Sequence, residues 1–247
     1  MKRRALTRDG TIAAAFVGAA TLLGFHLVGA LVLFAFFIPS IALSRLPHPH
    51  AERIRDVDKQ GPRDARQVLA NGGVAAAAAL LAFFLPQAHF IAAAAFVGAF
   101  AAASADTWGT EIGTRYGKNA RSILSLRADA AGLSGGVTTL GTLAEIAGAF
   151  VVATTATLLA LAPLAVGAIG GIVGAFADSY LGASVQDRRT CDRCARDCET
   201  DPHLCGAPTR RIRGLPGFRN DAVNFSATLA GAVASVIVVA LRARYLP

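Results

Sequence analysis

The sequence predicts an all-α fold, a polytopic transmembrane helix bundle. Of the 247 residues, 54% are hydrophobic and only 16% are charged, whereas a soluble domain carries about 25% charged residues. Apolar segments of about 18 residues or more recur along the chain, and such segments cross a bilayer of about 30 Å as helices. Basic residues fall in blocks between these segments. We therefore predict one integral membrane domain (1–247) with about seven spans (6–7) and a cytoplasmic N-terminus.

The predicted spans follow from the apolar segments in chain order. They lie at 11–25, 27–44, 68–85, 90–106, 134–160, 164–185 and 222–241. The first two are divided by a short polar break, Gly-Phe-His at 24–26. No small-residue cleavage site follows the basic start MKRRALTR, so we expect the first segment to stay as a span. The segment 134–160 is long, so we expect it to tilt or to begin as a half-buried turn.

The distribution of basic residues predicts the topology. Of the 24 Lys and Arg residues, 22 lie in the amino terminus and in three long loops at about 45–67, 107–132 and 186–221. By the positive-inside rule these parts are cytoplasmic, and only Arg242 and Arg244 would lie outside. A net charge of +8 placed in this way indicates a cell-membrane protein in contact with anionic lipid. We expect the lipid bilayer, and no nucleic acid, as a partner.

Three carboxylates in or at the edge of predicted spans are functional candidates. Asp106 closes the fourth span, Asp178 lies about 11 Å inside the sixth, and Glu145 is placed near the midplane of the fifth. No Lys or Arg lies in a predicted span, and a charge at the bilayer centre costs about +2.5 to +3.5 kcal/mol. Each acid could be protonated or hydrogen-bonded to Ser and Thr. A bound cation is the other solution, and Mg²⁺ typically takes one or two carboxylates with substrate phosphates.

Polar residues also flank the predicted spans. Arg63, Gln67 and Asn71 are spaced by four and share one helical face before the third span. Asn220 and Asn224 are one turn apart before the last span, where Asn220 or Asp221 could be the N-cap.

Two glycine-containing stretches are candidates for phosphate contact. Ser134-Gly135-Gly136, followed by Thr138, Thr139 and Thr142, could cradle phosphate through backbone N–H groups at a helix start. The stretch GTRYGKN (113–119) is not a Walker motif, because three residues separate its glycines and Asn119 follows the lysine. Its basic residues, together with a nearby arginine, stay candidates for phosphate contact: Arg115, Lys118 and Arg121.

All four cysteines lie in a cytoplasmic Cys-rich loop (186–221), within CDRCARDCETDPHLC. The cytoplasm disfavours structural disulfides. Cys191-x2-Cys194 can hold a soft metal, and Cys198, His203 and Cys205 could complete four ligands, although the later spacing departs from the usual double knuckle. The two hypotheses are structural Zn²⁺ and free or redox-active thiols. In both, the cluster serves to fold the loop.

Several stretches carry a resemblance to a known family. RQVLANGG, ASADTWGTEIG, SGGVTTLGTLAEIAGA, GAFADSYLGASVQ, the C-x2-C with its later HLCG, and NDAVNF run in family order from about residue 20 to 240. Together they resemble the transmembrane protein 19-like family, long catalogued as a domain of unknown function. Its plant members look like phytyl-phosphate kinases, and the family is distantly similar to membrane enzymes that use CTP and Mg²⁺. This chain departs from the pattern by its short amino terminus and by Cys198.

The resemblance implies a membrane-embedded phosphotransferase that acts on an isoprenyl or phytyl-type monophosphate with CTP or ATP and Mg²⁺ at the cytoplasmic face. Asp106, Asp178 and Asp221 would bind the Mg²⁺, with Glu111 in support and Glu145 deeper in the slot. Phosphate and substrate contacts would come from Arg63, Gln67, Asn71, Lys118, Arg121, Ser134, Gly135, Gly136, Gln186, Asn220 and Asn224. Cys191, Cys194, His203 and Cys205 would be the Zn²⁺ ligands.

Two other functions are alternatives. Intramembrane acids without basic partners also suit a cation- or proton-coupled transporter, although no inverted repeat is visible. A membrane assembly protein organised by the cysteine loop would need no intramembrane carboxylates.

The sequence leaves two possibilities for the role of Glu111. If the helix continues past Asp106, Glu111 points about 140° away and has a different role; otherwise the helix breaks near Gly109.

Overall fold

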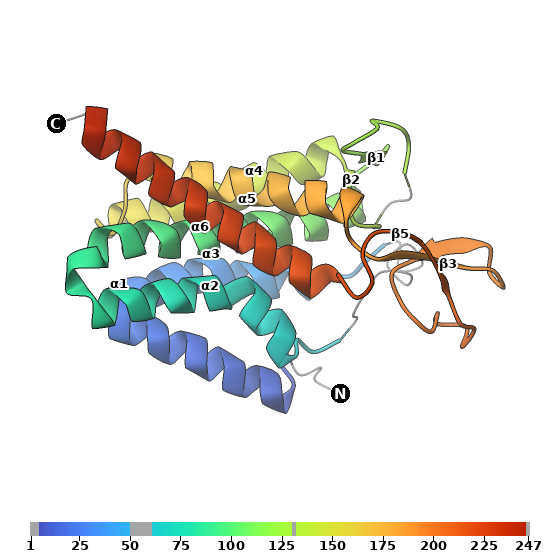
Figure 1. Cartoon of the computed structure of the whole chain (residues 1–247), viewed down its shortest axis with the longest axis horizontal. Coiled ribbons are helices and arrows are strands. Elements are labelled where there is room, and N and C mark those ends of the chain that lie inside the picture. The colour runs from blue at the N-terminus through green and yellow to red at the C-terminus, as the bar shows by residue number, and fades with distance from the viewer. Residues whose placement is uncertain (1–4, 50–60, 130–131, 246–247) are drawn as a thin grey trace.

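The computed structural model describes residues 5–49, 61–129 and 132–245 as a bundle of six helices with short strands at one end (Figure 1). All six helices are long and apolar enough to cross a membrane. The predicted polytopic bundle is therefore confirmed. The helices are α1 (Arg8–Ser44), α2 (Ala65–Phe84), α3 (His89–Tyr116), α4 (Thr139–Leu158), α5 (Leu164–Ser184) and α6 (Asn220–Tyr245), with a 3-10 turn at Pro86–Ala88.

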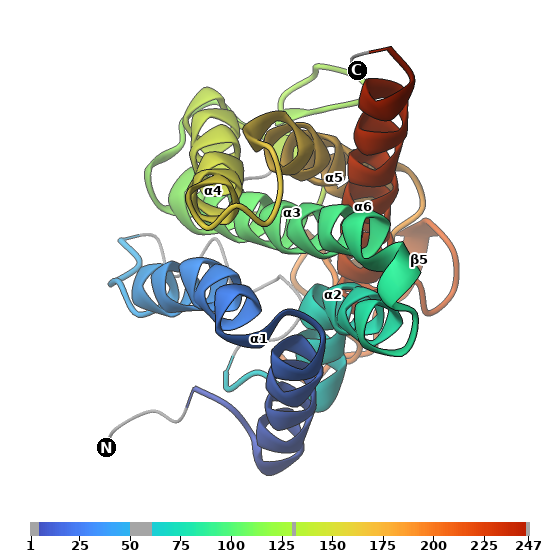
Figure 2. The same ribbon diagram turned by 90° about the vertical axis from the view of Figure 1, so that its left-hand side faces the viewer.

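Helix α1 folds back on itself and crosses the bundle twice. Its backbone leaves the helical region at His26 (φ 51°, ψ −144°), inside the predicted break at 24–26. At the start of α1, Thr7 N–H donates to Arg63 O at 3.1 Å, just before α2. At the fold, the Phe25 ring lies 5.2 Å from that of His89, at the opposite end of the bundle. The two halves run in different directions (Figure 2).

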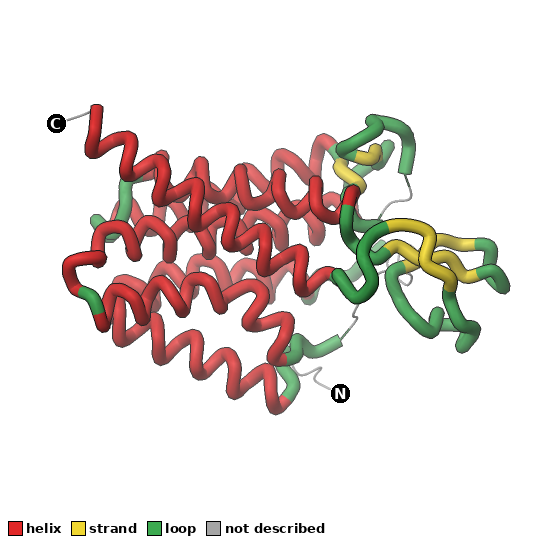
Figure 3. The backbone as a smooth tube through the Cα atoms, in the orientation of Figure 1, coloured by secondary structure: helices red, strands yellow, loops and turns green. Residues whose placement is uncertain are grey.

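The long loops gather at one end of the bundle, which we call the loop end (Figure 3). There β1 (Arg121–Ser122) pairs with β2 (Gly136–Val137). Between α5 and α6, three strands form an antiparallel sheet in the order β4-β3-β5: β3 (Arg188–Cys191), β4 (Arg196–Cys198) and β5 (Arg210–Arg213). An all-α prediction implies loops without strands, and these short strands were therefore not predicted. Most of the basic residues on which the predicted cytoplasmic side rests lie in these loops.

Helix α3 is the central element of the bundle. Of the 18 residues in its most apolar stretch, 72% are buried. In the other helices, at most 44% of the corresponding stretch is buried. Phe96 and Phe100 are fully buried and pack on each other with ring centroids 5.0 Å apart. Large apolar side chains on the other helices, such as Leu158 and Phe176, point outwards, where lipid tails would cover them.

Small residues let the helices approach closely. A Cβ atom added to Gly98 of α3 would collide with Ser235 and the Gly231 backbone of α6, and one added to Gly170 of α5 would meet the same two residues. Such contacts are how helices associate in lipid, where burial of apolar surface gives little driving force. The Ser235 hydroxyl donates to Val166 O at 2.8 Å, so this crossing also joins α6 to α5 by a hydrogen bond.

Two predicted span boundaries were wrong, and both concern the acids. Helix α3 continues to Tyr116, ten residues beyond the predicted end at Asp106, and α4 begins at Thr139 instead of 134. The hydropathy of the sequence falls at Asp106. The turns of α3 after Asp106 nevertheless stay helical, because α4 packs against them. Asp106 consequently lies well inside α3, and Glu145 lies in the second turn of α4, on the loop-end side of the middle of that helix.

Candidate functional site

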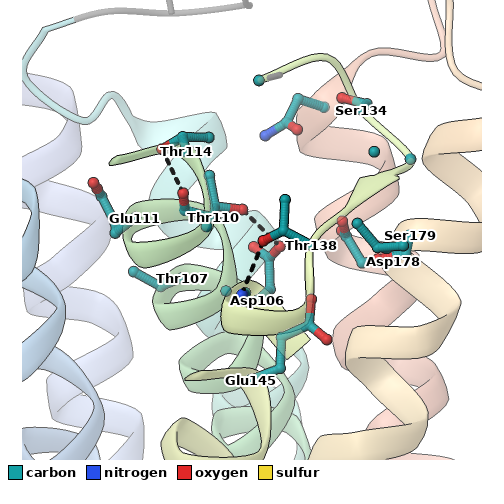
Figure 4. A pocket seen from close by; sticks show the side chains of 18 of the residues that line it. Asp106, Thr107, Thr110, Glu111, Thr114, Ser134, Thr138, Glu145, Asp178 and Ser179 are labelled. Atoms are coloured by element: carbon teal, nitrogen blue, oxygen red, sulfur yellow. Dashed lines mark hydrogen bonds between the residues drawn. The ribbon is translucent and has the colours of Figure 1, made fainter. Parts of the chain in front are cut away.

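A polar cavity of about 290 Å³ opens at the loop end. Helices α2 to α6 and the segment 132–138 all contribute to its lining. The volume is near the lower limit of small-molecule sites, which is about 300 Å³. Figure 4 shows the cavity and the side chains that project towards it.

Three carboxylates from three helices face the same space. Asp106 comes from α3, Glu145 from α4 and Asp178 from α5 (Figure 4). The Asp106 and Asp178 carboxyl groups are within hydrogen-bonding distance of each other, and Thr110 Oγ1 lies 3.5 Å from Asp106 Oδ1. Within the described residues, no Lys or Arg forms an ion pair with any of the three. This arrangement concentrates negative charge that a cation would neutralise.

Glycines on α3 and α4 bring the acids together. A Cβ atom on Gly109 would overlap the Glu145 side chain, and one on Gly113 would lie 3.2 Å from the Gly141 backbone. With no side chains at these positions, the first turns of α4 lie directly on α3. Glu145 is therefore held next to Asp106, three residues before Gly109 on the same helix.

Amide side chains extend the polar lining towards α2 and α6. The Asn224 amide lies between two partners: one end is 3.5 Å from Asn71 Oδ1, and the other is 3.3 Å from Asp178 Oδ1. Asn71 Nδ2 donates to Gln67 O at 2.9 Å, which fixes its rotamer along α2. Asn71 of α2 and Asn224 of α6, each predicted as part of a polar helical face, thus lie next to each other at the cavity. Asn220 lines the cavity as well.

Two arginines border the acids. Burial lowers the pKa of Arg63 from its ordinary value, while the Glu111 and Asp106 carboxylates act in the opposite direction. Its guanidinium nevertheless stays charged. Arg115 forms an ion pair with Glu111 one turn earlier on α3 and donates to Leu46 O at 3.3 Å. Because α3 is unbroken at Gly109, Glu111 is turned away from Asp106 (Figure 4), and the two acids have different surroundings.

The turn before α4 supplies neutral donors. Thr138 is the N-cap of α4, and its hydroxyl accepts from Gly141 N–H at 3.0 Å. Ser134, Gly135 and Gly136 line the cavity just before it. Gly135 has φ +84° and packs against Ala183 of α5, so a side chain here would be strained and would also collide. A helix N-terminus and a glycine turn facing one cavity favour an anionic ligand.

The cavity brings together most of the predicted site residues. It is lined by Asp106, Glu111, Glu145, Asp178, Arg63, Gln67, Asn71, Ser134, Gly135, Gly136, Asn220 and Asn224. Four predicted residues do not line it. Lys118 and Arg121 lie exposed beyond the end of α3, Gln186 is buried beside the Gly214 turn, and Asp221 lies in the first turn of α6 but outside the cavity wall.

Several lining residues were not predicted from the sequence. Thr107, Thr110 and Thr114 form a stripe along α3, and His48 Nε2 lies 3.3 Å from Thr114 Oγ1. Ser179 follows Asp178 on α5. The spacing of the threonines, i, i+3 and i+7, is a signal that could have found them, because these positions share a helical face.

A second cluster lies in the Cys-rich loop, outside the cavity. One ligand atom from each of Cys191, Cys194, His203 and Cys205 lies within 4.8 Å of all the others. No cysteine forms a disulfide. Cys198 is buried on β4, and its Sγ lies 3.7 Å from Thr200 O, so it is not part of this group.

The thiols of this cluster affect one another. The hydrogen bond with His203, followed by that from the Ala207 backbone, lowers the pKa of Cys205 to about 6. The hydrogen bond with Cys205 raises the pKa of Cys194 to about 11.

Fold and site together define a multi-pass helical membrane protein with a carboxylate-lined polar cavity at its loop end. The chain belongs to the integral membrane protein family DUF92, whose family model matches residues 1–232. This assignment confirms the resemblance found in the sequence motifs and the location in a membrane.

Two relatives illustrate the family. The chain is 29% identical to "Protein PGR" of Arabidopsis thaliana over 259 residues, covering 92% of this chain and 87% of the relative. It is 30% identical to "Uncharacterized membrane protein MJ0933" of Methanocaldococcus jannaschii over 184 residues, covering 74% and 75%. No solved structure matches the chain.

Proposed function

We propose that this protein is a membrane-embedded phosphotransferase. It transfers the γ-phosphoryl group of a nucleoside triphosphate to a lipid monophosphate of the isoprenyl or phytyl type, with Mg²⁺, at the cytoplasmic face. The observation that carries the proposal is the convergence of Asp106, Glu145 and Asp178 in one cavity that also holds Arg63 and a glycine turn. The lipid class follows from the family resemblance described above.

The donor set fits a magnesium ion. Carboxylate oxygens are hard ligands, and Mg²⁺ is typically bound by one or two carboxylates together with substrate phosphates. Asp106 and Asp178 would hold it, since their carboxyl groups approach each other from two helices. The Asn224 amide, 3.3 Å from Asp178 Oδ1, would fix the orientation of that carboxyl group. When bound, Mg²⁺ supplies positive charge that offsets the phosphate oxygens.

The remaining cavity residues would bind and orient phosphate groups. Arg63 brings a buried positive charge next to Asp106. The backbone N–H groups near Ser134 and at the start of α4 add neutral donors, and helix N-termini favour anions. A cavity of about 290 Å³ accommodates phosphates rather than a whole nucleotide and lipid, so the base and the lipid chain would extend beyond it.

The proposed reaction needs little covalent chemistry from the protein. An oxygen of the lipid monophosphate forms a bond to the γ-phosphorus, and the bond from that phosphorus to the β–γ bridging oxygen breaks. The products are a lipid diphosphate and a nucleoside diphosphate. The second pKa of a phosphate monoester is about 6, so the attacking oxygen is already deprotonated at neutral pH. Positioning and charge stabilisation then account for the rate enhancement.

The transporter alternative is less well supported by the described residues. A cation or proton pathway needs polar or ionisable groups through the whole membrane. The carboxylates instead lie in the half of the bundle near the loop end. Towards the other end α3 is lined with buried alanine and phenylalanine, and 146–177 contains no charged residue. A cavity open to one face suits an enzyme acting at that face.

The test is a transfer assay with purified protein in detergent or lipid nanodiscs. Mg²⁺, γ-labelled ATP or CTP, and a panel of isoprenyl monophosphates would be supplied, and the labelled lipid diphosphate measured. We expect label in the diphosphate for at least one pair of substrates. Asp106→Asn and Asp178→Asn should lower the rate by about 100-fold or more, as removal of key charge-stabilising groups does in other enzymes.

Asp192→Asn provides a matched control, because it is the same substitution at a side chain that is 75% exposed and outside the cavity. Its activity should equal that of the wild type. The proposal is overturned if no lipid phosphate yields a diphosphate with either nucleotide, or if Asp106→Asn and Asp192→Asn behave alike.

A further inference from the structure

The Cys-rich loop contains a four-ligand group that is separate from the cavity. Its four atoms come from a C-x2-C turn at the end of β3 and from His203 and Cys205, about ten residues further along. Three thiols and one imidazole in mutual reach are a common donor set for structural zinc. The inference drawn from it does not rest on the proposed function.

Two distances within the group match those of a tetrahedral ion. With Zn–S near 2.3 Å and Zn–N near 2.0–2.1 Å, two sulfurs on one zinc lie about 3.8 Å apart, and a sulfur and a nitrogen about 3.6 Å. Here Cys191 Sγ and Cys205 Sγ are 3.6 Å apart, and Cys194 Sγ and His203 Nδ1 are 3.6 Å apart. A disulfide would require about 2.05 Å between sulfurs. These two pairs are thus spaced as ligands of one metal ion, and all four ligand atoms lie within 4.8 Å of one another.

The sheet that carries the cysteines also holds a segment of the cavity wall. Glu199, next to the end of β4 and only 4% exposed, accepts from Ser134 N–H at 2.7 Å. Arg188 on β3 makes two hydrogen bonds to Asp129, at 2.7 and 3.0 Å. Asp129 and Ser134 both lie in the connection from α3 to α4, and Ser134 lines the cavity.

We propose that Cys191, Cys194, His203 and Cys205 bind one structural Zn²⁺, which orders the β3–β4–β5 sheet and, through Arg188 and Glu199, holds Asp129 and the segment 132–137 in place at the cavity. The loop between α5 and α6 has few large buried apolar side chains, and its buried residues include Cys191, Cys198 and His203. A metal supplies the cross-linking that such a small lobe lacks.

The first experiment measures metal in the full-length protein purified without chelator. We expect about one zinc per chain by elemental analysis, and, after exchange with cobalt, the visible spectrum of tetrahedral Co²⁺ with a thiolate-to-metal charge-transfer band. Cys194→Ser should lose the metal. Cys198→Ser is the matched control, because Cys198 is in the same loop but outside the group, and it should retain one equivalent.

The second experiment uses the wild-type chain, so that misfolding of a variant cannot decide the outcome. Zinc is removed with a high-affinity chelator, and hydrogen exchange is compared before removal, after removal and after zinc is restored. We expect faster exchange in β3 to β5 and at the Ser134 amide, unchanged exchange in the middle of α3, and recovery with zinc.

Four results would each overturn the proposal. They are a wild-type protein that contains no zinc and takes none up; iron in place of zinc; disulfides among these cysteines in freshly prepared protein; and equal zinc loss from Cys194→Ser and Cys198→Ser. Because the readouts are metal content and amide exchange, failure of the transferase assay leaves this test unaffected.

Discussion

Removal of the Asp129 carboxylate should loosen the segment that precedes α4. Asp129 and Arg188 form a bidentate ion pair in which the side chains are only 13% and 12% exposed. Removing one partner of a buried pair costs about 3–5 kcal/mol when the other is left uncompensated. Asp197, 3.2 Å from Arg188, compensates part of the charge. We therefore expect Asp129→Ala to destabilise this contact by about 2–3 kcal/mol.

Hydrogen exchange measures this loss directly. At about 1.4 kcal/mol per tenfold change in an equilibrium constant, 2–3 kcal/mol is about a 30- to 150-fold rise in the opened population. The amides of Ser122 and Ile123 report this opening, because both lie in the connection between α3 and α4. Ser122 N–H donates to Arg127 O at 2.9 Å, and Ile123 N–H donates to Gly135 O at 3.0 Å. Their exchange should accelerate by that factor, while amides in the middle of α3 keep their wild-type rates.

The control for this prediction is Asp192→Ala. Asp192 lies 3.7 Å from Arg210, and both side chains are mostly exposed, at 75% and 66%. Exposed pairs of this kind contribute little, so the exchange of Ser122 and Ile123 should not change. Equal exchange rates in Asp129→Ala and Asp192→Ala would refute the idea that the Arg188 pair holds the segment.

Three further predictions concern the cavity. Asp106→Asn should abolish Mg²⁺-dependent binding of nucleotide in a titration, whereas wild-type protein binds it. Gly109→Val should place methyl groups against the Glu145 side chain, destabilise the bundle by about 1–3 kcal/mol, and lower the temperature at which the purified protein unfolds. Thr138→Ala should remove the cap on Gly141 N–H, cost about 1 kcal/mol, and weaken binding of inorganic phosphate without changing the overall helix content.

Each of these has a result that would contradict it. Unaltered nucleotide binding in Asp106→Asn would remove that carboxylate from the metal site. An unchanged unfolding temperature for Gly109→Val would show that the two helices can separate at no cost. Phosphate binding by Thr138→Ala at wild-type affinity would mean that the start of α4 does not contribute to anion recognition.

The spans were predictable because hydrophobicity is a local property of the chain. A run of apolar residues long enough for the bilayer has few other structures available, and even the fold-back at His26 was signalled by the polar break at 24–26. The ends of α3 and α4 were not predictable in this way. Helical hydrogen bonds continue through polar residues when a neighbouring helix packs against them, and that neighbour is distant in the sequence.

The sequence predicted which residues belong to the candidate site better than it predicted where they lie. Asp106, Asp178 and Glu145 were recognised because each is an acid in an apolar segment, but their depths were judged from span ends that were misplaced. Lys118 and Arg121 follow the same segment in sequence and yet lie outside the cavity. Both are exposed, although Ala120 between them lines the cavity, and a pattern of charges cannot reveal which of these residues line the cavity.

By itself, the sequence determined that this protein crosses a membrane several times with its basic loops on one side, since composition and charge act residue by residue. It also determined that the cysteines share a loop. Only the tertiary structure decided that carboxylates from α3, α4 and α5 face one cavity, because that depends on glycine contacts between helices far apart in the chain. It likewise shows that the four predicted ligands, Cys191, Cys194, His203 and Cys205, lie within reach of one another, which their spacing in the sequence left open.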